Sequence, residues 1–136
     1  MKTKSFFSKS ILLLVVILAM SCNKDDSPAR GNTVSREIKY EITGTYSGHL
    51  DVLITDQNGN NLTEVVTALP WSKTITYPAN ILTIGGTANS VVANAGVAGQ
   101  TGSLKIYSGD AVKRTSNKTV GQNGLLIFDI QTYSFD

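Results

Sequence analysis

Side chains able to carry out catalysis or to bind a metal are few in this chain of 136 residues, which has one cysteine, Cys22, and one histidine, His49. Zinc sites and nucleophilic centres are commonly built from thiol and imidazole groups. One group of each kind falls short of the four ligands that a structural zinc site takes. His49 follows Gly48 and is not accompanied by the Gly-x-Ser-x-Gly motif of a strained nucleophile turn. We therefore expect no enzymatic activity, no cofactor and no metal site.

A second candidate cluster is the segment Asp-Gln-Asn-Gly-Asn at residues 56–60, which places oxygen-bearing side chains two residues apart, as a calcium loop does. A calcium loop also needs glycine at its sixth position and an acid at its twelfth. Those positions hold Asn61 and Thr67. The pair Asn58-Gly59 is a strong hairpin signal. We therefore favour a turn over a calcium site.

Trp71 is the only tryptophan and follows Pro70. A solitary indole ring can serve as a platform for a sugar or as a contact for a partner. More often it fills the core or one end of a sandwich, where its large area contributes several kcal/mol. We favour the core, and Trp71 stays a candidate contact for a ligand or partner.

The first 21 residues have the three parts of a secretory signal. Lysines come first, an unbroken apolar run follows at residues 11–20, and the small residue Ser21 precedes Cys22. Ten helical residues rise about 15 Å, whereas the core of a bilayer is about 30 Å thick. We therefore predict a signal peptide at residues 1–21, cleaved between Ser21 and Cys22, and not a transmembrane helix.

The four residues Ala19-Met20-Ser21-Cys22 resemble a lipobox, the site of type II signal peptidase, with alanine in place of the preferred leucine. In such proteins the cysteine becomes the first residue of the mature chain and carries the lipid. We therefore predict lipid attachment at Cys22, which accounts for a lone thiol in an exported chain. An ordinary secretory signal that happens to precede a cysteine is the alternative.

Loss of the signal changes the charge of the chain. The full sequence has 12 basic and 10 acidic residues. Lys2, Lys4 and Lys9 leave with the signal and no acid does, so 9 basic residues remain against 10 acidic ones. The mature chain therefore has no basic excess that would favour nucleic acid as a partner.

Residues 22–35 are polar and too poor in apolar surface to fold, so we expect a flexible lipidated tether. Lys24, Asp25 and Asp26 follow the cysteine and resemble the signal that exports lipoproteins of some Gram-negative bacteria to the cell surface. A charged linker is the alternative. The sequence thus predicts a location in the cell envelope, lipid-anchored in the outer membrane, exposed at the surface or otherwise facing the periplasm.

Residues 36–136 are expected to form one all-β domain. Apolar and polar residues alternate in most of it, and turn signals lie at residues 58–59, 109–110 and 123–124. The expected strands are residues 38–42, 50–54, 62–69, 74–77, 81–84, 104–107, 111–114 and 125–133. This spacing predicts a single antiparallel immunoglobulin-like β-sandwich of about seven to nine strands, with a small closed barrel as the alternative.

Two parts of the domain carry more specific expectations. The last strand is long and apolar, so we place it at the centre of a sheet, with Leu126, Phe128 and Ile130 on one face. Residues 90–102 are rich in glycine and alanine, and we expect a mobile loop there.

Four segments of the domain resemble, in their order, the small β-sandwich membrane proteins of the MmpS family. These segments are residues 40–44, 52–58, 69–73 and 104–112, of which the Pro70-Trp71 element is the most specific. The resemblance implies a sandwich held at the cell envelope beside an exporter of lipids or siderophores of the RND type. The chain departs from the family in having a lipid anchor where the family has a transmembrane helix, and in lacking late cysteines.

Together these features predict a lipid-anchored, non-enzymatic envelope lipoprotein that acts as a binding or accessory module. The family resemblance implies a more specific alternative, an accessory subunit that supports an RND-type exporter.

Overall fold

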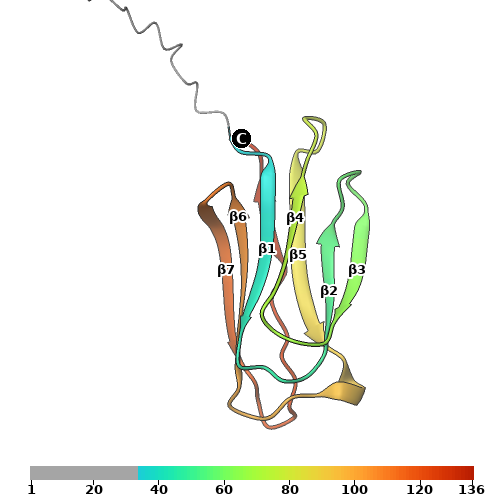
Figure 1. Ribbon diagram of the computed structural model, residues 1–136, viewed down its shortest axis with the longest axis vertical. Coiled ribbons are helices and arrows are strands. Elements are labelled where there is room, and N and C mark those ends of the chain that lie inside the picture. Colours follow the sequence, from blue (N-terminus) through green and yellow to red (C-terminus); the bar gives the residue numbers. More distant parts are fainter. Residues whose placement is uncertain (1–33) are drawn as a thin grey trace, which may run out of the picture. The chain divides into compact units, whose positions relative to one another are not determined.

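The computed structural model describes residues 34–136, which form a sandwich of two antiparallel four-stranded sheets (Figure 1). The first sheet has the strand order β4-β1-β6-β7, and the second has the order β3-β2-β5-β8. The strands are β1 (Glu37–Gly44), β2 (Leu50–Thr55), β3 (Asn61–Val66), β4 (Trp71–Thr76), β5 (Thr83–Ser90), β6 (Thr101–Ser108), β7 (Ala111–Thr119) and β8 (Gln131–Ser134). This arrangement confirms the predicted all-β sandwich of seven to nine strands, and two separate sheets replace the alternative of a closed barrel.

Alternation of apolar and polar residues decides which face of each strand is buried. In β1, the side chains of Ile38, Tyr40 and Ile42 are fully buried between the sheets, while the charged residues between them point outward. Leu104 and Ile106 in β6 lie opposite Ile42 and Tyr40 and are also fully buried. Each such side chain stabilises the fold by about 1.5–3 kcal/mol, so these central strands form the core of the domain.

Tyr40 and Tyr77 are the largest fully buried side chains, and the hydroxyl of Tyr40 has a hydrogen-bond partner inside the sandwich. The hydroxyl lies 2.8 Å from that of Tyr77, which in turn donates to the carbonyl of Thr55. A Cβ atom at Gly86 in β5 would lie 3.1 Å from the Tyr40 ring, so glycine there makes room for the ring. Burial raises the pKa of Tyr40 and of Tyr77, which keeps both phenols neutral.

The three expected turns are present, and each uses a glycine with positive φ. Gly59 (φ 85°) connects β2 with β3, and Gly109 (φ 57°) connects β6 with β7. Gly124 (φ 71°) lies in the turn before the last segment of the chain. Local turn signals in the sequence therefore place both hairpins correctly.

The prediction of a long central final strand is wrong. The strand β8 has four residues and lies at the edge of the second sheet, next to β5. Leu126 and Phe128 are buried, as expected, but Ile130 is 73% exposed and does not share their face. Before β8, the segment pairs with β5 only through an isolated bridge between Asn89 and Ile127.

Side chains of β5 explain why the strand is interrupted. The Thr87 hydroxyl donates to the carbonyl of Phe128 at 2.9 Å, and the Ser90 hydroxyl lies 2.6 Å from the backbone nitrogen of Leu126. These hydroxyls bind backbone groups that a continuous ladder would pair with other backbone groups. Residues 125–130 therefore lie alongside β5 as an irregular segment and not as a continuous strand.

Three of the loops at one end of the sandwich, residues 45–49, 91–100 and 120–124, lie together, and we call them the tip unit (Figure 1). The loop 91–100 contains the short 3-10 helix η2 (Val92–Asn94). Backbone hydrogen bonds of 2.9 Å join this loop to both of its neighbours, through His49 and through Gly124. The loop expected to be mobile is thus hydrogen-bonded on both sides.

The small residues of the tip unit serve close packing. Tyr46 is buried among the loops, and its hydroxyl lies 2.6 Å from that of Ser90. A Cβ atom at Gly48 or at Gly96 would lie 2.4 Å from Tyr46. Glycine at these two positions therefore leaves the space that the ring of Tyr46 needs.

The opposite end is fastened by Arg36, directly before β1. Its guanidinium donates to the carbonyls of Pro78 and Ile81, both at 2.8 Å, and of Ala79 at 3.2 Å. The same group lies 4.3 Å from the centre of the Phe135 ring. Arg36 therefore ties the beginning of β1 to the β4–β5 loop and to the C-terminal residues, which lie beside it in Figure 1.

Candidate functional site

The residues predicted to direct cleavage, lipid attachment and surface export lie outside the described part of the chain. They are Ser21, Cys22, Lys24, Asp25 and Asp26. The boundaries drawn for the signal peptide and the tether, and the roles of these five residues, stay predictions.

The two candidate metal-binding positions have structural roles at turns. The Asp56 carboxylate accepts hydrogen bonds from the backbone nitrogens of Asn58 and Asn60, both at 2.8 Å. These bonds, that of Asn60 first, lower the pKa of Asp56. The backbone of His49 is bonded to the loop 91–100. Within residues 34–136, no three side chains of the His, Cys, Asp and Glu types come together as metal ligands.

Trp71 lies at the start of β4, at an edge of the first sheet, and is partly buried against the core. Its indole N–H donates at 3.3 Å to Glu64 of β3, which is an edge strand of the second sheet. Glu64 also pairs with Lys73 at 2.7 Å. The interpretation of Trp71 as a packing residue agrees with this position at the margin of the core, and its contact with a ligand or partner stays a prediction.

Glu64 and Lys73 form an ion pair that connects the edge strands β3 and β4. Lys73 lies opposite Tyr40 in the β1–β4 pairing, and Glu64 lies opposite Val52 in the β2–β3 pairing, so both residues share the inward faces of their sheets. Hydrogen bonds from Lys73 and then Trp71 lower the pKa of Glu64. This side of the sandwich is therefore closed by an ion pair and an indole.

The outer face of the first sheet carries a second charged group. The Glu41 carboxylate accepts from Lys39 at 2.8 Å and from the Tyr107 hydroxyl at 2.7 Å. The Lys39 ammonium also lies 4.2 Å from the centre of the Tyr107 ring. These hydrogen bonds, that from Lys39 first, lower the pKa of Glu41, and the bond to Glu41 raises the pKa of Lys39. The three residues satisfy one another, which is typical of a structural cross-strand cluster.

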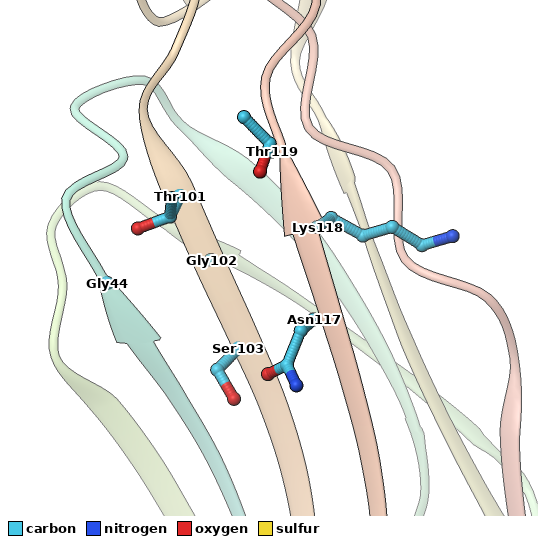
Figure 2. Close-up of a pocket in the computed structure, with 7 residues that line it drawn as sticks. All are labelled: Gly44, Thr101, Gly102, Ser103, Asn117, Lys118 and Thr119. Atoms are coloured by element: carbon cyan, nitrogen blue, oxygen red, sulfur yellow. The ribbon is translucent and has the colours of Figure 1, made fainter.

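A hollow of about 320 Å³ lies on the same sheet, close to the tip unit (Figure 2). We call it the polar hollow, and its lining residues are Gly44, Thr101, Gly102, Ser103, Asn117, Lys118 and Thr119. They come from the end of β1, the beginning of β6 and the end of β7. At Gly44 (φ 136°), a Cβ atom would lie 2.2 Å from the carbonyl oxygen of Thr101. A glycine there allows β1 and β6 to approach closely beside the polar hollow.

The side chains in the polar hollow are neutral hydrogen-bonding groups, with one exception. Ser103 and Asn117 lie opposite each other in the β6–β7 pairing, and Figure 2 shows both side chains on the same side of the strands. Lys118 points away from them in Figure 2, and its ammonium pairs with Asp129 at 2.7 Å. The Ser103 hydroxyl oxygen is buried and has no hydrogen-bond partner among the described residues.

Sequence reasoning did not identify the polar hollow. Its polar residues occupy positions that face outward in a sandwich, where Ser, Thr and Asn are ordinary. Only the pairing of β6 with β7, together with Gly44, gathers them at one place. The pattern of a single strand contains no signal that would distinguish Ser103 from other outward-facing residues.

No protein-family model matches the chain, and no curated protein matches it either. The structure defines a small all-β domain made of two antiparallel four-stranded sheets. In residues 34–136, no helix has the length and apolar character needed to cross a membrane.

Proposed function

We propose that this protein is a lipoprotein of the bacterial cell envelope, anchored in the outer membrane by a lipid on Cys22. In this proposal the β-sandwich is a binding or accessory module and not an enzyme. The observation that carries the proposal is the order of segments in the sequence. A basic start, a short apolar run, Ser21-Cys22 and a polar tether precede a folded domain. The first strand of that folded domain, β1, begins at Glu37.

The surface of the domain supports a role in binding. The polar hollow is built on paired strands, and the neighbouring tip unit is held by hydrogen bonds among its loops. The tip unit also exposes the apolar side chains of Val92 (76%) and Val97 (64%). A preformed surface needs little ordering when it binds, which favours affinity.

Metabolic labelling with an alkyne analogue of palmitate tests the anchor. The full chain, expressed in a Gram-negative host, is expected to incorporate the label and to fractionate with the outer membrane. Cys22→Ala is expected to lose the label and to keep the mass of the precursor, because type II signal peptidase requires the cysteine. Ser21→Gly, which keeps a small residue before the cleavage site, is the matched control and should still be labelled. An unlabelled wild-type protein would overturn the proposal.

Surface exposure is tested by protease treatment of intact cells. If Lys24, Asp25 and Asp26 direct export, the wild-type domain is expected to be digested from outside. A variant with Asp25→Ala and Asp26→Ala should be labelled equally but protected. Complete protection of the wild-type protein in cells that express it would contradict the export role and leave the periplasmic orientation.

A second candidate is an accessory subunit of an RND-type exporter, as the resemblance to the MmpS family implies. The observation that favours it is the place of the Pro70-Trp71 element, the most specific part of the resemblance. Trp71 begins an edge strand of the first sheet, where a partner can approach. Crosslinking in intact envelopes is expected to recover an RND protein with the wild type and less of it with Trp71→Ala, while Trp71→Phe retains most of it. Repeated recovery without any RND protein would count against this candidate.

A further inference from the structure

We propose that the polar hollow binds one sugar unit of a neutral saccharide. This inference rests on the proposed role of the domain as a binding module, and it names the chemical class of the ligand. It is carried by three observations on the polar hollow, namely the type of its side chains, the unpaired hydroxyl of Ser103 and its size.

The side chains match a ligand that has many hydroxyl groups and no charge. Hydroxyls of Ser and Thr and the amide of Asn can each donate and accept hydrogen bonds, as the hydroxyls of a sugar do. Thr101, Ser103, Asn117 and Thr119 supply these groups from two adjacent strands. The one charged lining residue, Lys118, points away and is paired with Asp129. An anionic ligand would therefore find no unpaired cation among the lining residues.

Ser103 provides the second argument. Ser103 belongs to the lining of the polar hollow, and its hydroxyl oxygen is buried without a hydrogen-bond partner among the described residues. A buried polar group without a partner carries a free-energy cost, because its hydrogen bonds with water are lost. Rotation about the Cα–Cβ bond of Ser103 would turn its hydroxyl toward the polar hollow, where a sugar hydroxyl can supply the missing partner, so binding would remove that cost.

The volume of the polar hollow limits the size of the ligand, and the paired strands around it make the hollow rigid. A volume of about 320 Å³ lies at the lower end of the range for small-molecule sites, which suits one ring and not a long chain. The backbone around it is fixed by pairing of Thr101 with Thr119 and of Gly44 with Gly102. The Thr45 hydroxyl accepts from the backbone nitrogen of Thr101 at 2.9 Å, which links this edge to the tip unit. The strands that carry these side chains are therefore held in place before a ligand arrives.

Nuclear magnetic resonance titration of the full mature chain tests the inference. The protein is kept in an amine-oxide detergent, since maltoside or glucoside detergents are themselves saccharides. The probes are the methyl glycosides of glucose, galactose, mannose and N-acetylglucosamine, each up to about 50 mM, well above the dissociation constants of weak sites. At least one neutral glycoside is expected to shift the backbone amide signals of Thr101, Ser103 and Asn117 in a saturable way.

Variants locate the binding. Ser103→Ala and Asn117→Ala are each expected to weaken the binding of that glycoside about tenfold, the effect of losing one good hydrogen bond. Asn117→Asp, which keeps the shape of the side chain but removes its donors, should weaken it as well. Asn80→Ala, on the exposed β4–β5 loop at the other end of the domain, is the matched control and should bind like the wild type. Thermal unfolding of each variant verifies that it is folded.

Several outcomes would overturn the inference. They are the absence of saturable shifts with any of the four glycosides, shifts with glucuronate or inorganic phosphate alone, and equal loss of binding in Asn80→Ala. The test is separate from that of the lipid anchor. A palmitate-labelled, membrane-bound protein that ignores all four glycosides would reject the saccharide and leave the envelope lipoprotein standing. An unlabelled protein would reject the anchor whatever the titration shows.

Discussion

Two hydroxyl groups in this sandwich illustrate what a buried polar atom needs. The Tyr40 hydroxyl lies in the core and shares a hydrogen bond with Tyr77, which donates to Thr55. The Ser103 hydroxyl lies nearer the surface and has no partner among residues 34–136. The difference matters for stability, because a buried polar group without a partner carries a free-energy cost that a paired one avoids.

Removing the two hydroxyls is expected to have different effects on the free energy of unfolding. Tyr40→Phe removes one hydrogen bond from the core and should lower this free energy by about 1 kcal/mol. Ser103→Ala removes a buried group that has no partner, and should leave the free energy unchanged or raise it by up to about 1 kcal/mol. Urea denaturation of both variants beside the wild type measures the two effects. A larger loss for Ser103→Ala than for Tyr40→Phe would contradict the assignment of Ser103 as unpaired.

The cluster around Glu41 predicts a dependence of stability on acid. Hydrogen bonds from Lys39 and Tyr107 lower the pKa of Glu41 below its ordinary value of 4.5 in the folded protein. A carboxyl group with a lowered folded-state pKa stabilises the fold above its unfolded-state pKa, and this contribution is lost as the pH falls through the folded-state pKa.

The free energy of unfolding of the wild type is therefore expected to fall more steeply between about pH 5 and pH 2 than that of Glu41→Gln, which cannot be protonated. Glu37→Gln changes an exposed acid of the same strand that has no ion pair within the described residues, and it should follow the wild type. Urea midpoints across this range provide the comparison. Parallel curves for the wild type and Glu41→Gln would refute the contribution of the cluster.

At the scale of elements, amino-acid composition was a poor guide to the loops and the edge strands of the sandwich. The loop 91–100 is rich in small residues, yet its backbone is hydrogen-bonded to both neighbouring loops of the tip unit. The edge strands β3 and β4 carry the inward-facing charges of Glu64 and Lys73 where a core would favour apolar residues. Inward-pointing charges on edge strands oppose edge-to-edge association, which explains why the sheet tolerates them.

Two glycines of the loop 91–100 are needed for different reasons, Gly96 for close packing and Gly99 for its backbone conformation. Gly96 has no positive φ, but a Cβ atom there would lie 2.4 Å from the Tyr46 ring. Gly99 has φ 85° and nothing within 4 Å of such an atom. Gly96→Ala should therefore lower the melting temperature more than Gly99→Ala, whose cost of about 1 kcal/mol comes from the left-handed backbone alone. Differential scanning calorimetry measures both variants, and equal losses would show that Tyr46 moves aside.

The sequence predicts the hairpins of this fold better than its last strand, and the reason is distance along the chain. Gly59 and Gly109 act within their own turns, so a two-residue signal is sufficient to place them. The irregular segment before β8 depends on hydroxyls of Thr87 and Ser90, which lie more than 35 residues earlier in the sequence. No pattern within residues 125–133 reveals that its backbone groups will be taken by those side chains.

At the scale of the whole molecule, alternation of apolar residues was sufficient to predict a two-sheet sandwich, because burying one face of each strand leaves few other solutions. The polar hollow could not be predicted in the same way. It depends on which outward-facing residues become neighbours, such as Ser103 and Asn117, and that is decided by the register between strands. The predicted anchor, in contrast, depends on adjacent residues around Cys22, so the sequence alone is sufficient to propose it.

The position of β1 has a mechanical consequence. This strand starts beside Arg36, where the tether would enter the domain, and ends at Gly44 beside the polar hollow. It is hydrogen-bonded along its length to β4 on one side and to β6 on the other. A pull between an anchored tether and a ligand held in the polar hollow would therefore load both ladders in shear, so that many hydrogen bonds would have to break together and not one after another.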